Sequence, residues 1–166
     1  MTNLRELTIV EIDSVTERDD IENLDLTGFI NLERLSLGCM TTGYDLWHTT
    51  RLLPPLPRVF TWRIIDFGDR DIRLHDFNQK HEDWVRAMVK FAAQHQRRLE
   101  CIFIDFLGHE NNSRLPESDV YPWDRLDDID RDSKKLGIRI RYDEPYMSKE
   151  EFEQDLRDLA NGISIY

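Results

Sequence analysis

The chain has 166 residues, of which 40% are hydrophobic and 33% are charged, and its formal net charge is -11. This acidic balance excludes a general nucleic-acid binder and disfavours docking on anionic membranes, because both activities need a basic face. The size suits a single domain over residues 1–166, and no apolar run approaches the roughly 18 residues of a membrane-spanning helix.

Four segments share the apolar frame Leu-x-x-Leu-x-Leu, which is typical of the strand of a leucine-rich repeat. These segments are Asn3–Ile9, Asn31–Leu37, Val59–Ile64 and Leu99–Ile104, and Leu136–Tyr142 is a weaker fifth copy. Alternation with period two predicts strands with one apolar face. Because the frame repeats in the same direction, we expect parallel strands, and each return to the next strand needs a dozen or more residues, usually a helix.

Helical periodicity predicts a helix in two of the segments that connect one strand to the next. In residues 78–98, one face of a predicted helix carries Trp84, Met88, Phe91 and His95. We expect His95 to lie at the edge of the core. A second helix is predicted over residues 123–135, with an inner side formed by Leu126, Ile129 and Leu136.

Two further helices are predicted from their ends. A short helix over residues 44–53 should end before Pro54–Pro55, because proline cannot continue a helix. A last helix over residues 148–160 begins with the capping box Ser148–Glu151 and ends at Asn161–Gly162. We expect this helix to cover the end of the strand array.

The first strand has no amphipathic element ahead of Leu4. An open edge of a parallel sheet is a liability, since it can pair with another chain. Two explanations are open: the chain is the C-terminal part of a longer array, or its first strand pairs with a second copy in a homodimer.

Two phrases, Phe29–Leu37 and Leu52–Val59, resemble the irregular leucine-rich repeats of fungal F-box-like proteins. The resemblance implies an α/β solenoid with a curved parallel sheet of about five strands, helices on its convex side and protein recognition as its use. Members that carry an F-box bring a client to a ubiquitin ligase, but no F-box fits before Leu4. The positions that normally hold asparagine are apolar here, which predicts an irregular array; they are Ile12, Met40, Phe67 and Leu107.

If the leucines point inward, the residues between them form three rows on the open face of the sheet. The predicted rows are Glu6, Arg34, Thr61 and Cys101; Thr8, Ser36, Arg63, Phe103 and Arg139; and Val10, Gly38, Ile65, Asp105 and Arg141. Arginine and aromatic residues are common anchors of protein interfaces. We therefore predict that a protein partner is contacted by Arg34, Arg63, Phe103, Arg139 and Arg141.

An enzyme is the alternative interpretation. Acidic and histidine side chains follow the strands, where ligands of open parallel sheets often bind, and the candidates for a lyase or isomerase are Asp66, His75, Asp105 and His109. No spacing in the chain matches a known catalytic, phosphate-binding or metal motif, so ordinary acidic loops are favoured and no metal or cofactor is expected. The two cysteines, Cys39 and Cys101, are too few for a disulfide framework and fit an intracellular protein, cytoplasmic or nuclear.

Overall fold

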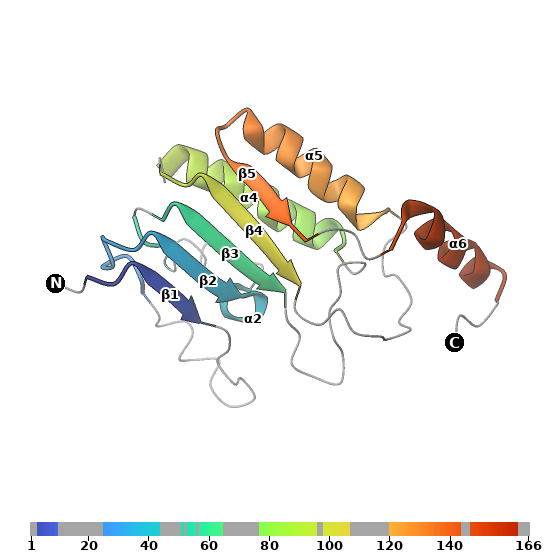
Figure 1. The fold of residues 1–166 in the computed structure, drawn as a ribbon, viewed down its shortest axis with the longest axis horizontal. Helices are drawn as coiled ribbons and strands as arrows, with labels where there is room; N and C mark the ends of the chain where they lie inside the picture. The colour runs from blue at the N-terminus through green and yellow to red at the C-terminus, as the bar shows by residue number, and fades with distance from the viewer. Residues whose placement is uncertain are drawn as a thin grey trace.

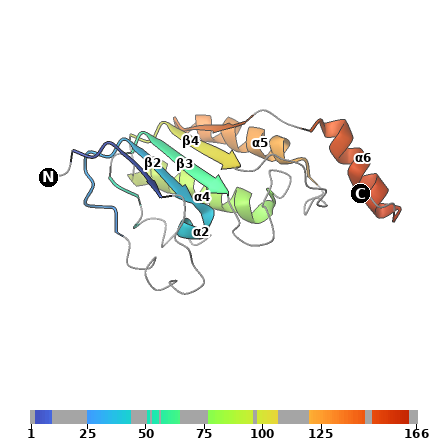
Figure 2. The same ribbon diagram turned by 60° about the horizontal axis from the view of Figure 1, so that its bottom comes forward.

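The computed structural model describes residues 3–9, 25–43, 51, 53–55, 57–64, 77–95, 98–106, 120–143 and 147–162. Five parallel strands form one sheet whose spatial order follows the chain: β1 (Glu6–Ile9), β2 (Arg34–Gly38), β3 (Val59–Ile64), β4 (Cys101–Phe106) and β5 (Arg139–Tyr142). The helices are α2 (Cys39–Thr42), α4 (Gln79–His95), α5 (Pro122–Lys134) and α6 (Lys149–Ala160). Figures 1 and 2 show α4 and α5 on the same side of the sheet.

The predicted α/β class and parallel sheet are confirmed, and three of the predicted helices agree with α4, α5 and α6 within a few residues. The short helix predicted over 44–53 lies almost wholly outside the described residues. No helix within the described part of the chain is long and apolar enough to cross a membrane.

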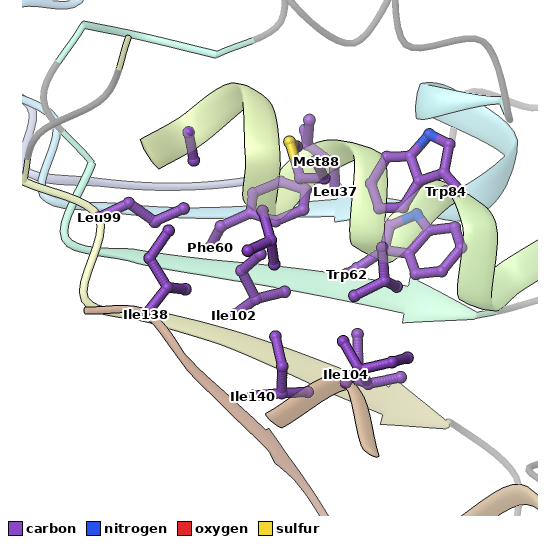
Figure 3. Close-up of a cluster of buried hydrophobic side chains, with 14 of the residues drawn as sticks. Leu37, Phe60, Trp62, Trp84, Met88, Leu99, Ile102, Ile104, Ile138 and Ile140 are labelled. Carbon is purple, nitrogen blue, oxygen red and sulfur yellow. The ribbon is translucent and has the colours of Figure 1, made fainter. Parts of the chain in front are cut away.

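The core lies between the sheet and the helices α4 and α5. Each of the two central strands buries alternate residues, and they are Phe60, Trp62 and Ile64 in β3 and Ile102, Ile104 and Phe106 in β4. Figure 3 shows Phe60 and Trp62 pointing toward Met88 and Trp84 on α4. The rings of Trp62 and Trp84 stack with centroids 4.0 Å apart, and Trp62 Nε1 donates to Thr42 Oγ1 at 2.9 Å. One apolar face per strand therefore suffices to hold this sheet on one helix layer.

A left-handed glycine connects α5 to β5. Gly137 has φ 78°, a conformation that residues with a side chain rarely adopt, and the N–H of Ile138 returns to Ser133 O at 3.1 Å. Leu136, in the same turn, is 52% exposed, so its predicted place on the inner side of the helix is wrong. The turn points this leucine outward because the helix has already ended before it.

Asp130 of α5 binds the outer edge of β5. Its Oδ1 accepts from the backbone N–H of Ile140 at 2.9 Å and from Arg139 Nε at 3.1 Å, and Lys134 Nζ lies 2.6 Å from Oδ2. Burial alone would raise the pKa of this carboxyl, but these donors hold it below its ordinary value. The carboxylate thus satisfies a backbone group on the edge strand that a further strand would otherwise bind.

The last helix has the predicted ends but not the predicted place. Ser148 and Glu151 form the capping box, and Gly162 follows the helix with φ 70°. Its buried residue Phe152 packs on Tyr121, just before α5, and Figures 1 and 2 show α6 beyond the start of α5 and not along β5. Cover for the last strand therefore comes from α5 and not from α6.

The register of β3 differs from the predicted rows. Val59 lies opposite Arg34 and Cys101, whereas Thr61, which was predicted in that row, lies one row further along opposite Phe103. The prediction treated Val59 as the first inward residue of its frame, but Val59 is half-buried on the open face. A period-two pattern is unchanged by a shift of two residues, so alternation alone could not fix this register.

A shift of two residues in the opposite direction occurs in β5. Arg139 lies opposite Cys101 and Arg141 lies opposite Phe103. The predicted rows placed Arg139 beside Phe103 and Arg141 beside Asp105. The frame was started at Leu136, which belongs to the turn and not to the strand.

A cysteine at position 59 tests this register. We expect Val59→Cys to form a disulfide with Cys101 under mild oxidation, because facing residues of adjacent strands lie about 5 Å apart, within disulfide range. Thr61→Cys is the matched control, since its row does not contain Cys101. Mass spectrometry of a non-reducing digest measures the yields, and efficient cross-linking of Thr61→Cys instead would support the predicted rows.

The histidine of the core is His81 and not His95. His95 is exposed and stacks on Phe91, so its predicted place at the core edge is wrong. His81 is buried beside the rings of Trp62 and Phe77, and its Nδ1 accepts from the backbone N–H of Asn78 at 3.2 Å. Burial, with a smaller effect of Lys80, lowers the pKa of His81 to about 4.

Because its pKa is lowered, we expect His81 to make the stability of the fold sensitive to acid. Above its ordinary pKa of 6.5, His81 is neutral in both states; between pH 6.5 and about 4 the unfolded chain binds a proton that the folded chain excludes. The free energy of unfolding should therefore fall by about 3 kcal/mol from this residue as the pH drops through that range. Urea denaturation at several pH values should show a smaller decline for His81→Gln than for the original chain, and equal declines would contradict the assignment.

Candidate functional site

One face of the sheet is left uncovered by α4 and α5 (Figures 1 and 2), and we call it the open face. In the observed register its rows are Glu6, Arg34, Val59, Cys101 and Arg139; Thr8, Ser36, Thr61, Phe103 and Arg141; and Gly38, Arg63 and Asp105. Each of these residues alternates with a residue of the core, so the same pattern that builds the fold displays this face.

Two of the predicted contact residues lie side by side. Phe103 of β4 and Arg141 of β5 are directly opposite each other in the sheet. Phe103 is half-buried, and Arg141 is exposed and forms no ion pair with the described residues. An aromatic side chain beside an arginine with spare donors is a common interface anchor.

Arg63 is occupied within the face. Its Nε donates to Asp105 Oδ2 at 3.0 Å, and the two side chains are only 26% and 16% exposed. Arg63 and Asp105 are Cα partners across β3 and β4, which the predicted rows did not bring together. This pair joins β3 to β4 across the open face and uses one of the five N–H donors of Arg63 inside the protein.

The remaining two arginines differ in their freedom. Arg34 Nη1 lies 4.0 Å from Glu6 Oε2, and both side chains are largely exposed, so this ion pair is weak. Arg139 bends over the edge of the sheet to Asp130 on α5, as described above. Of the predicted contacts, Arg34, Phe103 and Arg141 are thus the most available to a partner.

A shallow depression of about 290 Å³ lies on the open face over the first three strands, lined by Glu6, Leu7, Thr8, Arg34, Leu35, Ser36, Val59 and Thr61. Ser36 is only 8% exposed, and its Oγ has no hydrogen-bond partner within the part of the chain that the structure describes. Sequence reasoning assigned Ser36 to the open face but not to the site, although its small size among larger neighbours was the available signal. A buried hydroxyl without a partner costs free energy, so it marks a place where a ligand group gains a hydrogen bond.

A second depression of about 500 Å³ lies at the end of the sheet where the strands begin. It is lined by Asn3, Arg5, Ile30, Asn31, Leu32, Glu33 and Arg98. Arg5 Nη1 and Glu33 Oε1 are 3.6 Å apart, and the Arg5 side chain is largely exposed, whereas that of Glu33 is about half exposed. None of the predicted site residues lines this second depression. Among its described lining residues, no buried polar side-chain atom lacks a hydrogen-bond partner.

The thiol of Cys101 is not built as a nucleophile. Burial raises its pKa, although the charges of Arg141 and Arg139 oppose the shift. The thiol therefore stays protonated at neutral pH, whereas reactive cysteines have lowered pKa values.

The alternative acid and histidine cluster is only partly within the described residues. Asp105 is paired with Arg63, whereas Asp66, His75 and His109 lie outside the described part of the chain. Within the described part, no group of three histidine, cysteine, aspartate or glutamate side chains could hold a metal ion.

Comparison with known protein families, curated proteins and solved structures finds no significant match for this chain. The resemblance to leucine-rich repeats, the F-box-like role and self-association through β1 therefore stay predictions.

Proposed function

We propose that the chain is a leucine-rich-repeat-like solenoid that binds a protein partner through its open face. The observation that carries the proposal is the pairing of Phe103 with Arg141 on an uncovered sheet face, next to a depression lined by Ser36, whose hydroxyl has no partner among the described residues. Client recognition of the F-box type is the specific form that the sequence resemblance suggests.

The arrangement of the sheet supports this proposal. Five parallel strands follow the chain order, and the helices that pack on them lie on one side. Repeat proteins with this layering use the uncovered strands as a continuous surface for partners. The face also carries arginines and an aromatic residue, the residue types that contribute most to protein interfaces.

The proposal is tested with the double variant Phe103→Ala and Arg141→Gln. Arg63 is left unchanged because its removal would leave the shielded Asp105 carboxylate without the guanidinium with which it forms an ion pair. The original chain and the variant are used as baits with extracts of the source cell, and the captured protein is then purified for a titration. We expect the variant to weaken the dissociation constant at least about tenfold.

The matched control is Leu136→Ala with Arg131→Gln. Both residues are exposed, and they lie on the α5 side of the molecule, away from the open face. The control should bind as the original chain does. Unchanged binding by the open-face variant, with its melting curve preserved, would overturn the proposal.

A further inference from the structure

We propose that the open face recognises an acidic, extended segment of its protein partner. This inference rests on the proposed function and specifies the partner's chemistry. The segment crosses the strands from Arg141 on β5 to the depression beside Arg34 on β2.

The charge of the open face is opposite to that of the chain. The described residues of this face include four arginines and two acidic residues, in a protein whose formal net charge is -11. Arg63 and Asp105 form an ion pair with each other, and the ion pair between Glu6 and Arg34 is long, at 4.0 Å. Arg141 has no ion pair among the described residues, so it is the strongest attraction for a carboxylate.

This contrast gives specificity as well as attraction. An acidic segment is repelled by most of an acidic protein and attracted by a basic patch on it, so its productive encounters concentrate on that patch. A basic segment would meet the reverse pattern and bind elsewhere. Nucleic acid is also anionic, but long phosphate backbones need an extended basic surface, whereas this chain has a formal net charge of -11.

The spacing of the two arginines sets the reach of the segment. Arg34 and Arg141 are separated by β3 and β4 and by one row, which corresponds to about 16 Å between their Cα atoms. An extended peptide covers that distance in about five residues. Two carboxylates about five residues apart can therefore reach both arginines while an apolar side chain between them covers Phe103.

Ser36 fixes one end of this path. Its Oγ is buried and has no hydrogen-bond partner among the described residues, and Ser36 lines the depression in the same row as Phe103 and Arg141. The hydroxyl can donate to a carboxylate or carbonyl of the segment. The hydrogen bond would satisfy a group that the described residues leave without a partner.

The test is selection from a phage-displayed library of random peptides long enough to span the face. We expect the selected peptides to be enriched in aspartate and glutamate, and their binding to weaken as salt rises. The variant Arg34→Gln with Arg141→Gln should bind a selected peptide at least about tenfold more weakly by fluorescence anisotropy. The charge-matched control, Arg131→Gln with Arg157→Gln, alters exposed arginines of α5 and α6 and should leave binding unchanged.

Each other outcome overturns the inference. Neutral or basic peptides whose binding depends on Phe103 would refute the acidic segment and leave the proposed function standing. Equal losses in the two arginine variants would show that net charge, and not the open face, attracts the peptides. Tighter binding of a single-stranded oligouridine probe than of any selected peptide would assign the patch to nucleic acid.

Discussion

Phe60→Ala should lower the free energy of unfolding by about 3–5 kcal/mol. Phe60 is fully buried in β3 and its ring lies 6.4 Å from that of Trp84 on α4, so truncation removes apolar contacts and leaves a cavity in the centre of the core. Urea denaturation followed by tryptophan fluorescence measures the loss, because Trp84 and Trp62 report on the same region.

Phe103→Ala is the matched control for this substitution. Phe103 has the same side chain and lies in the adjacent strand, but it faces away from the helices and is only half-buried. We expect this substitution to lower the free energy of unfolding by about 1 kcal/mol, since folding removes less apolar area from water at position 103 than at position 60. Similar losses at positions 60 and 103 would mean that both faces of the sheet are covered, which would remove the basis for the open face.

Glu82→Gln should destabilise the protein by about 3 kcal/mol. Glu82 Oε2 lies 2.7 Å from Arg125 Nη1 on α5, and the two side chains are only 14% and 11% exposed. Its other oxygen accepts from Arg86 Nε at 2.8 Å. The neutral amide would remove the negative charge that lies between the guanidinium groups of Arg86 on α4 and Arg125 on α5, and that loss exceeds the cost of breaking an exposed ion pair.

Asp128→Asn provides the comparison for this prediction. Asp128 pairs with Arg131 on the surface of α5, and both side chains are more than half exposed. Thermal denaturation should show a change within about 0.5 kcal/mol. If the two substitutions have equal effects, the Glu82 pair does not hold the two helices together.

Fold class could be predicted because two periodicities are strong in this sequence. Alternation in residues 99–104 and the helical spacing of Trp84 and Met88 indicated a strand and a helix, which are β4 and α4 in the structure. The end signals of α6 were equally local: the Ser148–Glu151 capping box needs no information beyond four consecutive residues.

Register could not be predicted from the same pattern. The apolar residues of β3 alternate equally well when the frame begins at Val59 or two residues earlier, and only packing against the neighbouring strands decides between them. The Arg63–Asp105 pair followed from that decision and was therefore missed. The place of α6 was missed for a similar reason, since its contact between Phe152 and Tyr121 joins distant parts of the chain.

The candidate site was predicted in its residue types but not in its geometry. Arginines and Phe103 do lie on the open face, yet the side-by-side pairing of Phe103 with Arg141 depends on the two-residue shift in β5. Whether a side chain is occupied internally is also a tertiary property. Arg139 binds Asp130 of α5, which no pattern along the strand could have indicated.

Binding of a partner through the open face is measured most directly by titrating the isotope-labelled protein with its purified partner and following the amide chemical shifts. We expect the largest changes on Ser36, Thr61, Phe103 and Arg141 across the open face. Largest changes on the outer surfaces of α4 and α5, with the open face unaffected, would contradict binding through this face.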